Sequence, residues 1–420
     1  MKDSERSNTG GSVFGFRILR SFQSPAYRFY LPGALAQFAC LSMQIVTGPL
    51  LMYRLTGSAA LLGTMALVSA FPIIIVSMFG GAIADRVPKK RIIVLGLLGG
   101  VVVSIGVALA LSSGYISPER PGSWVFLIVA SLCMSSLMGL MMPALQAIIP
   151  EIVGREQIMN AVALNTMGMN ILNLIAPGVA GFMIDTFDFK AVYFTMAGLY
   201  LCSAFFISLV PATRPTTMTA GGNILGAIRQ GFQYMRKDTT IMFVLVFSLM
   251  VTVLSMPYQQ LLPIFVDDIL KVGATGMGIL MSVSGAGALI GSIILASSPD
   301  RKRGLLLLAS GIVAGMALVV FSFSSTWGLS LAVIVFVGLS QTFRMTIGST
   351  LLQAYAEAEY RGRVMSIFSM QWGFMSVCTF VAGLLAEVVP VQWVLGVLAM
   401  ILIVLSILSL IFIRVLRNLD

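Results

Sequence analysis

Long apolar stretches separated by short polar ones run along nearly the whole chain. A helix needs about 20 mostly apolar residues to cross the hydrocarbon core of a membrane. An open strand leaves its backbone polar groups unsatisfied in lipid, so helices are the choice here. The pattern predicts twelve membrane-spanning helices, at residues 31–53, 59–83, 92–113, 123–149, 160–184, 190–210, 240–266, 275–298, 303–323, 327–352, 362–386 and 390–414.

Composition supports an all-α polytopic membrane protein. Hydrophobic residues make up 58% of the chain and charged residues only 10%, whereas soluble domains carry roughly 25% charged residues. Histidine is absent, which removes the commonest general base and metal ligand. The four cysteines lie within apolar runs and show no spacing typical of a metal site or a disulfide framework. We therefore expect no metal and no cofactor.

The distribution of Lys and Arg predicts the orientation. With the N-terminus inside, the cytoplasmic segments hold 21 of these cations and the outer segments hold four, at Arg54, Arg120, Lys190 and Lys271. Cytoplasmic loops carry such an excess in membrane proteins. We expect both termini in the cytoplasm and the protein in the cytoplasmic (inner) membrane. This bias also explains the net charge of +10 without a nucleic-acid partner.

The longest polar connection divides the spans into two sets of six. We expect a cytoplasmic N-terminal segment (1–27), a six-helix bundle (28–211), a linker (212–238) and a second six-helix bundle (239–415). The second half of the linker has an apolar helical face flanked by cations, which is typical of an amphipathic helix on an anionic leaflet. A simple tether is the other interpretation.

The two sets of spans share sequence. LQAIIPEIVGREQIM (145–159) is similar to LQAYAEAEYRGRVM (352–365), and VAGFMID (179–185) is similar to VAGLLAE (381–387). An offset near half the chain length indicates two pseudo-symmetric six-helix halves. In secondary transporters such halves enclose a site near the membrane midplane.

The segment GGAIADRVPKKR (80–91), between the second and third spans, concentrates charge in an otherwise apolar chain. Together with twelve spans and the 6+6 repeat, it resembles the major facilitator superfamily, whose pattern in this loop is Gly-x-Leu-Ala-Asp-Arg-x-Gly-Arg-Lys. Pro88 stands where that family usually has glycine. RLTGSAALLGTM after the first span and PALQAIIPE after the fourth resemble the branch of enterobactin and macrolide exporters.

The resemblance covers about residues 28–415 and implies a cytoplasmic latch. Gly81 would allow close helix approach, and Asp85 would face the N-terminal end of the helix that begins near Gly362. The i, i+4 acid–arginine pairs would form matching helical ion pairs in the two halves. Alternatively, the cations only set topology. The predicted latch comprises Gly81, Asp85, Arg86, Lys89, Lys90, Arg91, Glu151, Arg155, Glu357 and Arg361.

Polar residues within spans are costly and suggest a cargo site. Arg344 is the deepest charge, and it would bind an anionic part of the cargo or else hold helix-end carbonyls. Pro257 and Pro263 would interrupt their helix. Each amide could instead join one helix to another. The candidate binding residues are Gln37, Gln44, Asn165, Asn173, Tyr258, Gln259, Gln341, Arg344, Gln371 and Trp372.

These features predict a secondary transporter that exports a small amphipathic molecule, such as a drug or siderophore, with proton coupling. The alternative is an importer or lipid or lysolipid flippase for an anionic substrate. Acids are absent from the middle of the spans, so the proton-coupling candidates are peripheral: Glu387 first, then Asp267 and Asp268, with Asp85 and Asp185 behind them. We expect a monomer in contact with lipid.

Two other classes fit poorly. An intramembrane enzyme would need a catalytic constellation, and the sequence offers no histidine, no metal-ligand cluster and no paired midplane carboxylates. A receptor would be indicated by a large soluble domain. No Gly-x-x-x-x-Gly-Lys-[Ser/Thr] motif occurs, so we expect no ATP site.

Overall fold

The computed structural model describes residues 20–211, 234, 238–298, 302–357, 360–417 and 419, without the side chains of residues 20, 74, 77–86 and 155. The predicted linker therefore lies almost wholly outside the described residues. At its end, the Asp238 carboxylate accepts hydrogen bonds from the backbone N–H groups of Thr240 and Ile241, which caps the next helix.

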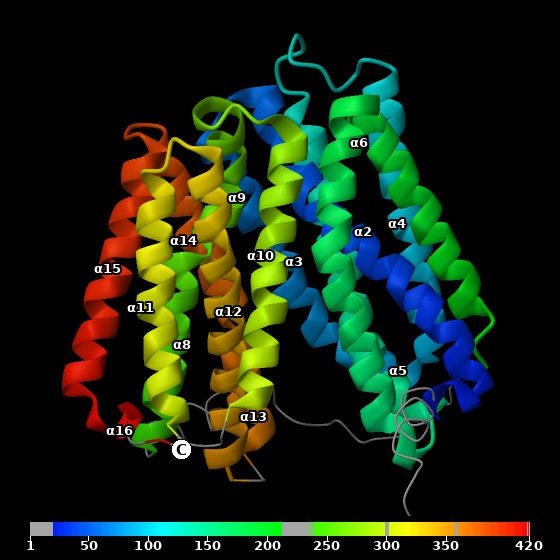
Figure 1. Cartoon of the computed structure of the whole chain (residues 1–420). Helices are drawn as coiled ribbons and strands as arrows, with labels where there is room; N and C mark the ends of the chain where they lie inside the picture. The colour runs from blue at the N-terminus through cyan, green and yellow to red at the C-terminus, as the bar shows by residue number, and fades with distance from the viewer. Residues whose placement is uncertain are drawn as a thin grey trace, which may run out of the picture.

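The described part of the N-terminal half contains two short 3₁₀ helices and five long helices (Figure 1). Helix α6 holds two spans, because Asp188 takes a positive φ of 74° within it and the chain folds back there. The elements are η1 (Arg20–Gln23), α2 (Pro25–Thr56), α3 (Ala59–Arg86), α4 (Lys89–Ser112), α5 (Trp124–Ile152), η2 (Arg155–Gln157) and α6 (Ile158–Ser208).

The C-terminal half is more segmented. Its first span breaks at Met256, where Pro257 has no N–H to donate, and then ends in the π-helical turn η3. The elements are α8 (Thr239–Ser255), α9 (Pro257–Ile264), η3 (Phe265–Ile269), α10 (Gly273–Ser297), α11 (Arg303–Ser322), α12 (Trp327–Tyr355), α13 (Arg361–Ser369), α14 (Gln371–Ala386), α15 (Val391–Phe412) and α16 (Arg414–Arg417).

The predicted all-α fold with twelve spans is confirmed. Ten helices in the described part of the chain are long and apolar enough to cross a membrane. One of them, α6, contains two spans. The twelfth is α3, of which only Ala59–Ile73 is described in full, although its backbone is helical to Arg86.

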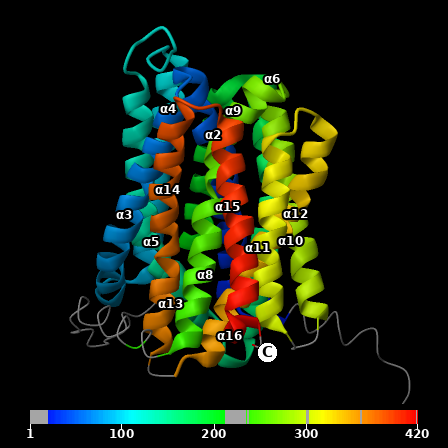
Figure 2. The same cartoon turned by 90° about the vertical axis from the view of Figure 1, so that its left-hand side faces the viewer.

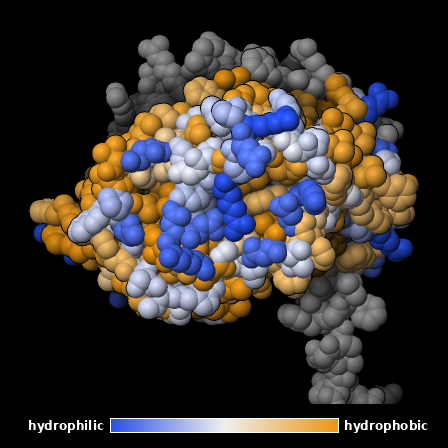
Figure 3. Space-filling view, turned by 90° about the horizontal axis from the view of Figure 1, so that it is seen from above, coloured by the Kyte–Doolittle hydropathy of each residue, from blue (hydrophilic) through white to orange (hydrophobic). Residues whose placement is uncertain are grey.

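The two halves meet at one end of the molecule and diverge toward the other (Figure 1). Helix α6 packs along α10, and α3 packs along α14, a neighbour relationship also visible in Figure 2. We call the end that holds the C-terminus of α2 and the start of α10 the closed end. The opposite end, which holds Lys89 and α16, is the splayed end. Seen from above, the closed end has polar side chains across its middle and apolar ones around its margin (Figure 3).

The predicted helical ion pair of Glu151 and Arg155 is wrong for a simple reason of chain geometry. Helix α5 ends at Ile152, before Arg155, so the i, i+4 geometry of one continuous helix does not arise. In the other half, the Glu357 carbonyl accepts a hydrogen bond from the Arg361 backbone N–H at 2.9 Å, and an ion pair between their side chains stays a prediction.

Candidate transport site

Backbone contacts without intervening side chains join the halves where α6 crosses α10. A Cβ placed on Gly181 would lie 2.2 Å from the Ala274 carbonyl oxygen, and one on Gly278 would lie 2.3 Å from that of Pro177. The contact continues to Gly285, where a Cβ would lie 3.1 Å from the Asn173 oxygen. Glycine is thus required for the observed helix separation.

The crossing of α3 and α14 is built in the same way. A Cβ on Gly383 would lie 2.6 Å from the Ala59 carbonyl oxygen. A Cβ on Gly63 would lie 2.8 Å from the Phe380 Cα. These two crossings bring the halves together at the closed end.

Two acids from η3 bind the end of α2. Arg54 pairs with Asp267, its Nε and Nη2 donating to the two carboxylate oxygens over 2.9 and 3.1 Å. The Tyr53 hydroxyl donates to the Asp268 carboxylate. Both predicted coupling acids on this turn therefore contact the N-terminal half. The sequence identified Arg54 only as one of the four outer cations and Tyr53 only as the last residue of the first span.

Glu387 crosses between the halves at the start of α3. Its Oε1 accepts hydrogen bonds from the Ser58 hydroxyl at 2.5 Å and from the Ala60 backbone N–H at 2.9 Å. These donors stabilise the charged form and hold the pKa of Glu387 below its usual value.

Asp185 lies near the end of the first span of α6, just before the kink at Asp188, and makes the corresponding contact with α10. Its two oxygens accept from the backbone N–H groups of Ala274 at 3.2 Å and Thr275 at 2.7 Å. Gly273 precedes them with a φ of 67°, and a Cβ there would lie 3.2 Å from an Asp185 oxygen. Glycine therefore serves both the backbone conformation and the approach of the carboxylate.

A cavity of about 360 Å³ lies among these groups at the closed end. Tyr53, Asp268 and Glu387 supply polar atoms to its wall, and Ile264 and Val391 supply apolar ones. Both halves contribute to it. Two of the predicted coupling residues, Asp268 and Glu387, thus line one cavity between the halves.

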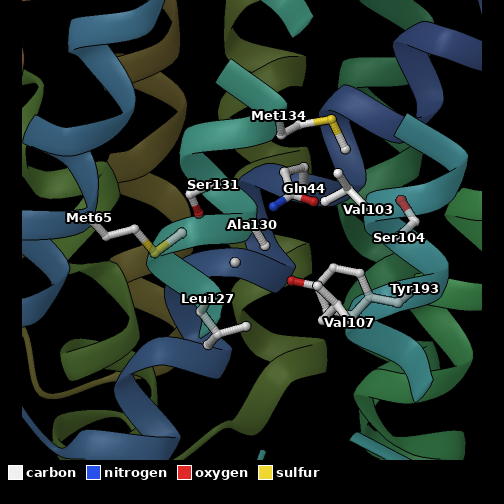
Figure 4. A pocket seen from close by; sticks show the side chains of 11 residues that line it. Gln44, Met65, Val103, Ser104, Val107, Leu127, Ala130, Ser131, Met134 and Tyr193 are labelled. Carbon is white, nitrogen blue, oxygen red and sulfur yellow. The ribbon is translucent and has the colours of Figure 1, made fainter. Parts of the chain in front are cut away.

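A second cavity lies inside the N-terminal half, among α2, α3, α4, α5 and α6 (Figure 4). Its volume of about 10 Å³ is roughly that needed for one water molecule. Gln44, Ser104 and Tyr193 line it, and the Gln44 Oε1 and Ser104 Oγ atoms are buried without a hydrogen-bond partner. Gln44 therefore faces a cavity too small for a drug-sized cargo in this state.

Arg344 is 1% exposed and lies within the C-terminal half. Its Nη1 donates to the Gln371 Oε1 at 2.8 Å, and the same oxygen accepts from the Thr252 hydroxyl at 2.7 Å. The Arg344 Nε and Gln371 Nε2 atoms are buried without a partner. This cluster joins α8, α12 and α14 and lines neither of the two cavities.

The remaining predicted binding residues are scattered. Tyr258 is 1% exposed on α9, near Ser284, Gln259 and Gln341, and its hydroxyl is buried without a hydrogen-bond partner among the described residues. On the N-terminal side, the Asn173 Oδ1 accepts from the Ser42 hydroxyl at 2.6 Å, linking α6 to α2. The other members are Gln37, which is buried, Asn165, which is half-buried, and Trp372, which is exposed.

At the splayed end, the side chains of Gly81, Asp85, Arg86 and Arg155 lie outside the described residues. Lys89 is 4% exposed and contacts the Glu151 carboxylate within the N-terminal half. Lys90 and Arg91 follow in the first turn of α4. On the other side, the Arg361 guanidinium donates to the Ala356 carbonyl, and the Glu357 backbone N–H donates to the Tyr234 hydroxyl.

The family model of the Major Facilitator Superfamily matches residues 30–377 and 300–418. The chain belongs to this superfamily. Its structural neighbours agree on the fold: a nucleoside transporter, NupG, has a TM-score of 0.71 at 14% identity, covering 93% of this chain and 99% of its own. A bacterial homologue of the lysosomal transporter Spinster has a TM-score of 0.69 at 13% identity, covering 94% and 98%.

Sequence relatives of this superfamily member are exporters by name. Macrolide efflux protein A of Streptococcus pyogenes is 24% identical over 74% of this chain and 77% of its own length. Enterobactin exporter EntS of Shigella boydii is 24% identical over 83% and 82%. Multidrug efflux pump Tap of Mycolicibacterium fortuitum is 24% identical over 84% and 87%. The chain is thus a multi-pass membrane transporter with efflux relatives, and the predicted family and branch are confirmed.

Proposed function

We propose that the protein is a secondary active exporter that moves a small amphipathic molecule by alternating access. The observation that carries the proposal is the one-ended contact between the halves, which are joined at the closed end and diverge at the other (Figure 1). Rigid halves that rock about a shared site need contacts of this kind, which one state makes and the other breaks.

The cation distribution orients this state. Among the described residues, four cations lie at the closed end, at Arg54, Arg120, Lys190 and Lys271, and far more lie toward the splayed end. By the positive-inside rule the closed end faces outward and the splayed end faces the cytoplasm. The proposed state is therefore inward-facing, the state in which an exporter loads its cargo.

The direction of transport is inferred from the named relatives, which are exporters of a macrolide, of enterobactin and of several drugs. The 27 methionines supply flexible apolar side chains suited to varied cargo. An anion importer or lipid flippase would need an accessible cation, and Arg344 is fully buried in this state. We therefore place export first.

Everted membrane vesicles test the proposal. Overexpressed protein should drive accumulation of a radiolabelled macrolide, or of iron-free enterobactin, into vesicles that carry an inside-acid pH gradient. Collapse of the gradient should abolish the uptake. Accumulation in right-side-out vesicles instead would identify an importer. Movement of a fluorescent phospholipid between leaflets in proteoliposomes, without macrolide or enterobactin uptake, would identify a flippase.

A further inference from the structure

The internal repeat reappears in space at the closed end. Helices α6 and α14 carry the same Val-Ala-Gly sequence, with an acid four residues after the glycine. Gly181 and Asp185 correspond to Gly383 and Glu387, each pair 202 positions apart. In both copies the glycine and the acid contact the opposite half, so their common spacing places one close contact and one carboxylate on the same helix end.

The surfaces that these residues meet are also equivalent. Asp185 accepts from the Thr275 backbone N–H at the start of α10, and Glu387 accepts from the Ala60 backbone N–H at the start of α3. Thr275 and Ala60 are 215 positions apart. The same offset relates Ala274 to Ala59, whose carbonyl oxygens contact Gly181 and Gly383, respectively.

Helix N-termini are suitable partners for these acids. The first N–H groups of a helix have no acceptor within it, and they carry a partial positive charge. Each carboxylate satisfies such donors on the other half of the protein. The same contact made within one helix would stabilise only that helix, whereas here it is lost when the halves separate.

We propose that Asp185 and Glu387 are a matched pair of latches that hold the closed end shut, and that this end opens only after both leave the opposing helix N-termini. This inference concerns regulation of the proposed transport cycle. The closure of this end by Asp185 and Glu387 follows from their contacts alone. Only the consequence of closure for cargo release rests on the proposed function.

The charged neighbours fit a gating role. Glu387 shares its cavity with Asp268 and Tyr53, and Asp185 interacts with Arg54, which is itself paired with Asp267. A group that carries a proton across a membrane must be reached from both sides. All of these acids lie at one end, where they govern closure instead of ferrying protons through the protein.

Pulsed electron paramagnetic resonance measures the proposed closure directly. Spin labels are attached at Glu119→Cys, between α4 and α5, and at Ser325→Cys, between α11 and α12, both exposed. Cys133, Cys202 and Cys378 are replaced by serine, and the buried Cys40 is kept. The label pair reports the separation of the halves at the closed end without any cargo.

We expect a short inter-label distance in the parent protein and a longer one in the variants. Asp185→Ala or Glu387→Ala should each reduce the ratio of closed to open molecules about 2- to 30-fold, the range that follows from loss of a helix cap. The double variant should reduce it by roughly the product, because the two sites are distant.

Asp188→Asn is the matched control, because Asp188 lies three residues after Asp185 and, among the described residues, accepts a hydrogen bond only from the adjacent Phe189 N–H and none from the opposite half. It should leave the distances unchanged. Unchanged distances in the folded double variant, judged by gel filtration, would overturn the proposal, as would an equal shift in Asp188→Asn. If the vesicle assay fails while these distances shift as expected, the export proposal falls and the latch stands.

Discussion

Arg54 at the end of α2 and Asp267 on η3 form an ion pair across the two halves, with Nε and Oδ2 2.9 Å apart. Both side chains are partly exposed, at 33% and 20%. Such pairs contribute only about 0–1 kcal/mol, because water screens the charges. The pair therefore selects the register in which the halves meet more than it holds them together.

Charge exchange tests this role. Arg54→Asp and Asp267→Arg should each place like charges opposite one another and lower the ratio of closed to open molecules by less than about fivefold. The combined variant should restore the parent ratio, since it recreates the pair in reverse. Spin labels at Glu119→Cys and Ser325→Cys measure this ratio of closed to open molecules. Failure of the combined variant to recover would show that each side chain acts through other contacts.

The glycine at the crossing of α6 and α10 should not tolerate a side chain. Gly181→Ala would place a methyl group 2.2 Å from the Ala274 oxygen, so the helices must separate. We expect a loss of about 1–3 kcal/mol, the usual result of overpacking. Gly198→Ala on the same helix is the control, because a Cβ there meets nothing within 4 Å.

Thermal unfolding followed by intrinsic fluorescence checks this prediction. Gly181→Ala should lower the midpoint by several degrees, and Gly198→Ala should leave it equal or slightly higher, since alanine favours helix. Equal midpoints for the two variants would mean that the crossing adjusts without cost.

The fold was predictable because each span carries its own signal. Length and apolarity located twelve helices, and Lys and Arg predicted their direction. The boundary at Arg155 was missed because an i, i+4 spacing looks the same whether or not the helix continues between its two residues. The available signal was Gly154, because glycine is common just after the end of a helix.

The closed-end contacts were less accessible to sequence reasoning. Glu387 was a coupling candidate only because it is an acid near a span end, and nothing local shows that Ser58 and Ala60 lie beside it. The repeat of VAGFMID and VAGLLAE did carry the information. It needed the structure to show that the acids in the two copies face equivalent helix ends.

The pKa of Glu387 predicts how acid acts on the closed end. The hydrogen bonds from Ser58 and Ala60 lower this pKa in the closed state. Their stabilisation is thus fully present above the ordinary glutamate value of about 4.3. It is lost only as the pH falls through the lowered pKa, because a protonated carboxyl is a poor acceptor for these donors.

We therefore expect the inter-label distance to stay constant from pH 8 to about pH 4.5 and to lengthen below it. Asp185 also accepts hydrogen bonds as a carboxylate, so the contribution of Glu387 is the difference between the parent and Glu387→Gln. Opening of the parent near pH 6, abolished by Glu387→Gln, would contradict the lowered pKa and restore Glu387 as a group that titrates at physiological pH.

Substitution of Arg344 distinguishes a structural role of this side chain from a role in cargo binding. It is buried with Gln371 and Thr252, and no acid pairs with it among the described residues. An unpaired buried charge is costly, and replacing it by an apolar side chain of similar length is often neutral or stabilising. Arg344→Met should accordingly keep or raise the unfolding midpoint.

If Arg344 binds the anionic part of a cargo after the halves move, the same variant should weaken binding of 2,3-dihydroxybenzoate about 10- to 100-fold, the cost of a lost charged hydrogen bond.

Binding measured by thermal shift, with a neutral macrolide as the matched ligand, distinguishes the two roles. Loss confined to the anion supports recognition by the guanidinium, and Arg344→Lys should recover part of it because the charge remains. Equal affinity of Arg344→Met and parent protein for the anion would make Arg344 a joint between α12 and α14 and nothing more. A large fall in the midpoint would show that the bond to Gln371 outweighs the cost of burying the charge.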